Sequence, residues 1–410
     1  MAAPTHNHAN YQARLDFIQH LLHDRLELKV SLEDAEITPI QYDPESPFKY
    51  NNFVYRISLP SPIPSEKPAS DEPRQAGCAT IPAGTKSLIL RLTNPNAEGM
   101  NPKTRIENEV AIITLASAAL RDFQPHVVPS IYAWGSAATS SSQGWILQEL
   151  MPGTPVDEAF DTLDLPQKQQ IFAQMAQLLK ALQDYKLPES ITGFGGVTFD
   201  ETGRIVSTAM TSVGLGPWPS YEASFKDRLE LALRKADVNP YIQGWRANSV
   251  RDRLDRFVER GVPAQVIVHA DFTANNLLFD ATSGRITALI DYDFACILHP
   301  SYEFLRSFDG AGGQFRGWSG DEASEQTVLR EAKLRGFPSP LPPMVKSGVK
   351  RPSTIEGIDS VADVDTILRS TLPWRVTNSD ILRLQTEEVI VKCRDKNEEQ
   401  LITLLSRLGF

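Results

Sequence analysis

Cysteine and long apolar runs are both scarce in this chain of 410 residues. Its three cysteines, Cys78, Cys296 and Cys393, are far apart and form no C-x-x-C pair. We therefore expect neither a disulfide framework nor a cysteine-based zinc site, and a reducing compartment such as the cytoplasm fits this usage. No run of about 18 apolar residues occurs, and the first residues lack the apolar core of a signal peptide, so no membrane association is predicted.

Positive charge is also in short supply. The chain carries 41 Lys and Arg against 51 Asp and Glu, a formal net charge of −10. A protein that grips a nucleic-acid backbone needs a basic field, so nucleic acid is not an expected partner. A nucleotide site is not excluded, because a few local cations and a metal ion can hold the phosphates.

The first part of the chain reads as a small sheet with one central helix. Alternating or apolar runs predict strands over 53–59, 87–92, 131–134 and 144–151. Helical periodicity predicts helices over 10–29 and 104–121. The stretch 60–86 is dense in Pro, Ser and charge, which predicts a mobile surface insertion.

After Pro152-Gly153 the pattern becomes mainly helical, so we place a domain boundary at residues 150–153. Helices are predicted over 166–186, 221–236, 246–260, 361–370 and 395–408. Residues 193–206 contain three glycines but no following helix, which favours a hairpin over a dinucleotide-binding loop. Residues 309–360 carry no assignable pattern. The predicted fold class is α+β.

The segment 265–294 contains three polar side chains, Asp271, Asn276 and Asp291, that we expect to lie close together. Strands are predicted over 276–280 and 285–290, joined by a four-residue turn. Asn276 opens the first strand and Asp291 follows the second, so antiparallel pairing brings both to one end of the hairpin. Asp271 lies in the loop that enters this end.

This set of oxygen-bearing groups suits phosphoryl transfer. Magnesium takes a few hard oxygen ligands and keeps several waters, so Asn276 and Asp291, with Asp293 as a further candidate, can bind it together with phosphate oxygens. Asp271, away from the metal, can accept the proton of an attacking hydroxyl. The alternative is a polar loop whose side chains only satisfy turns.

The motif also resembles a known family. His269 to Asn276 has the spacing H-x-D-x-x-x-x-N and is followed by Ile290-Asp291-Tyr292-Asp293. This is similar to the aminoglycoside phosphotransferase and choline kinase superfamily, in particular its fungal-type members. The resemblance implies that Asp271 is the catalytic base, that Asn276 and Asp291 bind Mg²⁺, and that His269 braces the loop.

The resemblance extends upstream of the catalytic segment. Glu109 matches the helix glutamate that pairs with a strand cation, here Arg91, and residues 148–153 match the hinge that meets an adenine edge. ATP contacts are thereby implied at Asn52, Arg91, Glu109, Gln148 and Leu150. The implied fold is a bilobal protein-kinase-like fold, with an N-terminal lobe over 1–150 and a larger helical lobe over 151–410.

Two departures from the family pattern keep alternatives open. Arg91 stands where the strand cation is usually Lys, and a guanidinium is not equivalent to an ammonium group. This leaves room for a nucleotide-binding pseudokinase. Residues 43–53 contain no glycine, and Asp291 is not followed by Phe-Gly, both of which disfavour a Ser/Thr protein kinase. The hydroxylated acceptor, the choice between ATP and GTP, and the oligomeric state stay open.

Overall fold

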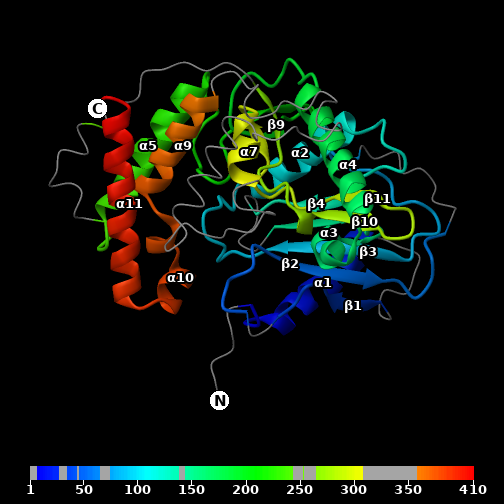
Figure 1. Cartoon of the computed structure of the whole chain (residues 1–410). Helices are drawn as coiled ribbons and strands as arrows, with labels where there is room; N and C mark the ends of the chain where they lie inside the picture. The colour runs from blue at the N-terminus through cyan, green and yellow to red at the C-terminus, as the bar shows by residue number, and fades with distance from the viewer. Residues whose placement is uncertain are drawn as a thin grey trace.

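The computed structural model describes residues 7–26, 35–43, 46–64, 74–137, 144–242, 253, 265–307 and 358–410. Apart from Arg253, the predicted helix over 246–260 lies outside these ranges, as does most of the unassigned stretch 309–360. Within them, the predicted two-lobed α+β architecture is confirmed (Figure 1). In the part of the chain that is described, no helix combines the length and apolar character needed to cross a bilayer.

The first lobe is built on a five-stranded antiparallel sheet with strand order β1-β2-β3-β5-β4. Its strands are β1 (Glu36–Pro39), β2 (Asn52–Ser58), β3 (Ser87–Thr93), β4 (Ile131–Gly135) and β5 (Trp145–Glu149). Two helices belong to this lobe, α1 (Tyr11–Leu26) and α2 (Arg105–Ala119).

Side-chain alternation along β3 decides what each face of this sheet meets. Leu88, Leu90 and Leu92 pack in the core that includes Ile18 and Leu22 of α1. The intervening Arg91 points to the other face, where α2 lies, and reaches Glu109. The period of two in the strand thus places a cation opposite the helix glutamate.

The predicted surface insertion over 60–86 is mostly exposed in its described residues, and some of its backbone groups pair with the first lobe. Ile63 is buried and exchanges backbone hydrogen bonds with Thr85 and Gly84. Farther along, the amide of Ala79 donates to the carbonyl of Ile131 at 2.7 Å. The two ends of the stretch thus pair with each other near Ile63, and Ala79 pairs with β4. Residues 65–73 lie outside the described chain, and the mobility of the insertion stays a prediction.

The second lobe combines small antiparallel sheets with helices. Its described elements in the middle of the chain are β6 (Thr154–Pro155), α3 (Val156–Ala159), α4 (Leu165–Asp184), β7 (Gly196–Phe199), β8 (Ile205–Thr208), α5 (Tyr221–Asp237), β9 (Val266–Val268), β10 (Leu277–Asp280), β11 (Arg285–Leu289), β12 (Cys296–Leu298) and α7 (Ser301–Ser307). The helix α4 begins with a capping box between Asp164 and Gln167, which satisfies its first amides. The hairpin predicted over 193–206 is confirmed as β7 and β8.

The C-terminal elements are α9 (Ile358–Thr371), α10 (Ser379–Leu384) and α11 (Glu387–Arg407). A shared apolar core joins α5, α9 and α11 into one group of helices (Figure 1). The helix α10 reaches the first lobe, where Asp380 accepts a hydrogen bond of 2.9 Å from the amide of Lys49. The C-terminal region therefore contacts the loop that precedes β2.

Candidate active site

The loop after β9 is fixed by α7. Glu303, which is buried, accepts hydrogen bonds from the amides of His269, at 2.6 Å, and Ala270, at 3.1 Å. Ser307 accepts a third, of 2.9 Å, from the amide of Phe272. From the same helix, Arg306 donates from Nε to the carbonyl of Ala270 at 2.7 Å. Four backbone groups of this loop are thus held by one short helix.

Two non-glycine residues in this region have left-handed backbone conformations. Ala270 has φ 63° and Asp291 has φ 64°. Such residues cost about 1–3 kcal/mol each and persist only where surrounding contacts hold them. The contacts of Glu303 and Arg306 supply that restraint at Ala270, which immediately precedes Asp271.

A substitution at residue 270 tests this strain. We expect Ala270→Val to lower the free energy of unfolding by about 1–3 kcal/mol, because a β-branched side chain is poorly accommodated at positive φ. Ala270→Gly should be nearly neutral. Ala288→Val, at an equally buried site within β11, is the matched control. Denaturant titration measures all three, and equal losses at residues 270 and 288 would contradict a backbone origin.

Asp271 and Asn276 lie directly together. The amide nitrogen of Asn276 donates to Oδ2 of Asp271 at 2.8 Å and to its backbone carbonyl at 2.9 Å. Desolvation raises the pKa of Asp271, while the guanidinium of Arg306 lowers it. The predicted strand start at Asn276 is slightly wrong: Ala274–Asn276 form a 3-10 turn, and β10 begins at Leu277.

Arg91 lies among the carboxylates of Glu109, Asp291 and Asp293. Its guanidinium forms a short ion pair with Glu109 and donates to Oδ1 of Asp291 at 2.8 Å. Oδ1 of Asp293 lies 3.4 Å away. Burial opposes the charge on Arg91, but these three carboxylates raise its pKa, so it stays protonated. The predicted pairing of Arg91 with the helix glutamate is thus present.

The carboxylates differ in their surroundings. Desolvation and the nearby charge of Asp293 raise the pKa of Asp291 to about 6. Desolvation also acts on Asp293, but the guanidiniums of Arg105 and Arg91 lower its pKa to about 2. Burial raises the pKa of Glu109, and Arg91 acts in the opposite direction.

Carboxylate oxygens of Glu109, Asp291 and Asp293 all lie within 4.8 Å of one another, and Mg²⁺ takes hard oxygen donors of this kind. Glu109 and Asp293 are buried in ion pairs with Arg91 and Arg105, whereas Asp291 is the most accessible of the three, with 37% of its side chain exposed. The backbone carbonyl of Asn276 accepts from the amide of Ile290, the residue before Asp291, at 2.9 Å. The hairpin of β10 and β11 therefore brings Asn276 and Asp291 to one end, as the spacing predicted.

Three further predicted residues have clear positions. His269 is fully buried, its Nε2 lies 3.2 Å from the carbonyl of Ile290, and burial lowers its pKa to about 4, so the ring is neutral. These are the contacts of a bracing residue. Gln148 is buried on β5, and within the described chain its Oε1 has no hydrogen-bond partner. Leu150, just after β5, is half-buried.

The residue that sequence reasoning missed is Arg105. It is 2% exposed, and its Nη2 donates to Oδ2 of Asp293 at 2.7 Å and to the side-chain oxygen of Asn52 at 2.9 Å. Asn52, predicted as a nucleotide contact, in turn donates to Asp293 at 2.6 Å. The signal available was the spacing Arg105-x-x-x-Glu109, which places both side chains on one face of α2.

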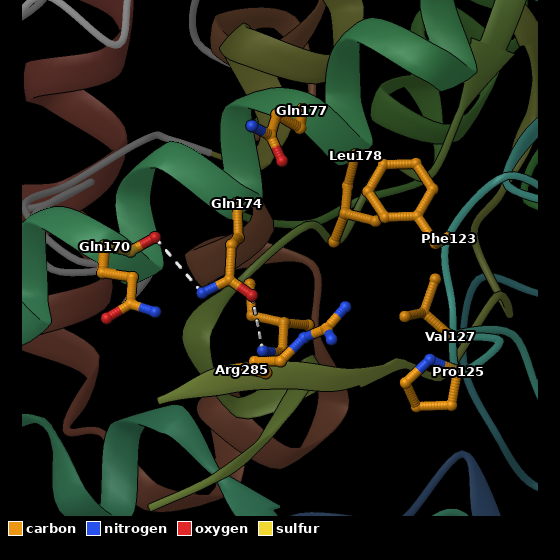
Figure 2. A pocket seen from close by; sticks show the side chains of 9 residues that line it. Phe123, Pro125, Val127, Gln170, Gln174, Gln177, Leu178 and Arg285 are labelled. Carbon is orange, nitrogen blue, oxygen red and sulfur yellow. Dashed lines mark hydrogen bonds between the residues drawn. The ribbon is translucent and has the colours of Figure 1, made fainter. Parts of the chain in front are cut away.

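A pocket of about 260 Å³ lies elsewhere, between α4 and the chain around Phe123, Pro125 and Val127 (Figure 2). Gln174 on its α4 side accepts a hydrogen bond from the amide of Ile286, at the edge of β11. None of the predicted site residues lines this pocket.

Comparison with known proteins gives a family and a fold. The profile of the phosphotransferase enzyme family (APH) matches residues 80–336. No curated protein sequence matches.

Two solved structures are similar over nearly the whole chain. One is a putative aminoglycoside phosphotransferase from Ralstonia eutropha, with 16% identity, TM-score 0.52, and coverage of 96% of this chain and 98% of that one. The other is an ethanolamine kinase from Plasmodium vivax, with 12% identity, TM-score 0.51, and coverage of 97% and 89%. At these identities the likeness concerns the fold.

Proposed function

Because the chain belongs to the phosphotransferase enzyme family, we propose that it transfers the γ-phosphoryl group of ATP, bound with Mg²⁺, to a hydroxyl of a small molecule. The observation that carries this proposal is the arrangement of Asp271, Asn276 and Asp291 at one end of the β10–β11 hairpin, with strained backbone at Ala270, beside Asp271, and at Asp291 itself. Strain of this kind gathers at functional sites.

Each residue has a distinct part in the proposed reaction. Asp271 accepts the proton of the acceptor hydroxyl, and the hydrogen bond from Asn276 orients its carboxylate. Arg91, held by Glu109, would face the phosphates, and Asn276 and Asp291 would hold the metal. A bound Mg²⁺ ion supplies charge neutralisation on the phosphate oxygens.

The proposed function specifies only one feature of the acceptor, a hydroxyl group that receives the phosphoryl group. The two similar structures are described as an aminoglycoside phosphotransferase and an ethanolamine kinase, whose substrates differ in size and charge. Pocket residues in one fold vary with the substrate, so the fold does not choose between such acceptors.

Transfer of labelled phosphate tests the function. The protein is incubated with [γ-³²P]ATP and Mg²⁺, and with panels of aminoglycosides, amino alcohols and sugars, or with a casein-type protein substrate. We expect label to appear in a small-molecule product, and we expect this transfer to require Mg²⁺. Label in protein alone would favour a protein kinase. Nucleotide binding without any transfer or hydrolysis would favour a pseudokinase.

The pH profile tests Asp271 as the base. Only its carboxylate accepts a proton, so kcat/KM should fall as the pH drops through the raised pKa of Asp271. Arg306 lowers that pKa, so Arg306→Met should move the acid limb to higher pH, whereas Arg306→Lys should move it less. An acid limb that stays in place in Arg306→Met contradicts this electrostatic link, whatever happens to the rate at high pH.

A further inference from the structure

A buried network joins the first lobe to the segment that carries Asp291. It consists of Asn52 at the start of β2, Arg105 at the start of α2, and Asp293; we call it the Asp293 network. Asp293 is 2% exposed and Arg105 is equally buried. The Arg105 side chain is among the largest fully buried ones of the described chain.

Both carboxylate oxygens of Asp293 are engaged. Oδ2 accepts from Nη2 of Arg105 at 2.7 Å and from the side-chain amide, Nδ2, of Asn52 at 2.6 Å. Oδ1 accepts from Nε of Arg105 at 3.3 Å, with Arg91 3.4 Å away. A metal ligand needs an oxygen that faces the ion, and here guanidinium and amide donors face both.

We propose that Asp293 is not a metal ligand but a positioning residue: Arg105 and Asn52 engage its carboxylate and thereby hold the segment that carries Asp291. The metal then binds at Asp291 and Asn276, and not at Asp293. This proposal rests on the proposed phosphotransferase function and replaces the sequence-based expectation that Asp293 binds metal.

The charge balance at Asp293 agrees with this role. Its carboxylate is paired with the guanidinium of Arg105, and both side chains are buried. A metal ion at Asp293 requires expelling Arg105 from this buried pair, which leaves an uncompensated buried charge.

The network also explains how Asp291 keeps its backbone conformation. Asp291 has φ 64° and stands two residues before Asp293. Clamping Asp293 to α2 and β2 anchors the chain just after this strained residue. The clamp therefore acts on metal binding through Asp291, without touching the ion.

Counting bound Mn²⁺ ions tests the proposal. Electron paramagnetic resonance measures Mn²⁺ bound per protein in the presence of saturating AMP-PNP, for the wild type and for Asp291→Asn, Asp293→Asn and Asn52→Ala. We expect Asp293→Asn to bind as many ions as the wild type. Asp291→Asn and Asn52→Ala should each lower Mn²⁺ affinity about tenfold or more, the latter as a supporting contact does.

A paired substitution covers the case in which Asp293→Asn does not fold, because it leaves Arg105 unpaired. Arg105→Met/Asp293→Leu removes both charges, and we expect it to regain much of the thermal stability that Asp293→Asn loses while still binding as many Mn²⁺ ions as the wild type. Asn52→Ala removes one hydrogen bond to Asp293 but leaves the Asp293–Arg105 ion pair, so we expect it to stay folded at the temperature of the measurement while its Mn²⁺ affinity falls.

Fewer ions bound by Asp293→Asn than by the wild type would overturn the proposal and leave the phosphotransferase function intact. Unchanged Mn²⁺ affinity in Asn52→Ala would also overturn the positioning role. A wild type that binds no Mn²⁺ with the nucleotide would overturn the proposed function itself.

Discussion

Asp271→Asn should lower kcat by about a thousandfold, since a positioned general base typically contributes 10²- to 10⁴-fold. Asparagine keeps the size of the side chain and the hydrogen bond from Asn276 can rearrange, but the amide oxygen is too weak a base to take the proton of a hydroxyl. The affinity for ATP should change by less than about threefold, because the loss concerns the transition state and not nucleotide binding.

This result can be measured before the acceptor is identified. Slow ATP hydrolysis, in which water takes the place of the acceptor, reports the same base. The matched control is Asp122→Asn, at a side chain that is 93% exposed and remote from the predicted site in the sequence. Normal turnover in Asp271→Asn, or an equal loss in Asp122→Asn, would remove Asp271 from the role of base.

Asp291→Ala should weaken ATP binding at fixed Mg²⁺ by about tenfold to hundredfold, since even supporting partners of a metal ligand contribute that much. Asp291 is the most exposed member of the carboxylate cluster, and Arg91 contacts it at 2.8 Å. Removing it takes away a metal ligand and leaves Arg91 paired with Glu109.

The dependence on metal separates this effect from a general distortion. In excess EDTA the wild type and Asp291→Ala should bind ATP with nearly the same, weaker affinity, because the lost contact passes through the ion. Isothermal titration calorimetry with and without Mg²⁺ gives both numbers. A defect of equal size in EDTA would mean that Asp291 acts through the fold and not through the metal.

The parts of the site that could be predicted follow from local sequence patterns. The runs of residues 276–280 and 285–290 form a hairpin, and antiparallel pairing places Asn276 and Asp291 at one end. The alternation along β3 points Arg91 toward Glu109. In both cases a short-range rule fixed the direction of the side chain, and the family resemblance supplied its role.

Contacts between distant segments could not be predicted in this way. Arg105 and Asp293 are 188 positions apart, and Asn52 and Asp293 are 241 apart. No periodicity relates such residues, because their meeting depends on how the two lobes pack. The apolar pattern that predicts helix α2 also does not show that a charged side chain such as Arg105 is buried.

The C-terminal region gives a second example of a contact between distant residues. Asp380 and Lys49, 331 positions apart, meet where α10 contacts the loop before β2, and Lys49 also pairs with Glu98 at 3.0 Å. A helix could be predicted near the end of the chain, but its docking site on the first lobe could not. In residues 60–86, Pro and Ser predicted a surface insertion, but they do not show which backbone groups, such as those of Ile63 and Ala79, pair with the rest of the lobe.

A crystal structure with Mg²⁺ and AMP-PNP tests the central claim most directly. We predict an ion about 2.1 Å from the side-chain oxygens of Asn276 and Asp291, with Asp271 off the metal and facing the γ-phosphate. A nucleotide bound elsewhere, or an ion that contacts neither Asn276 nor Asp291, would contradict the account.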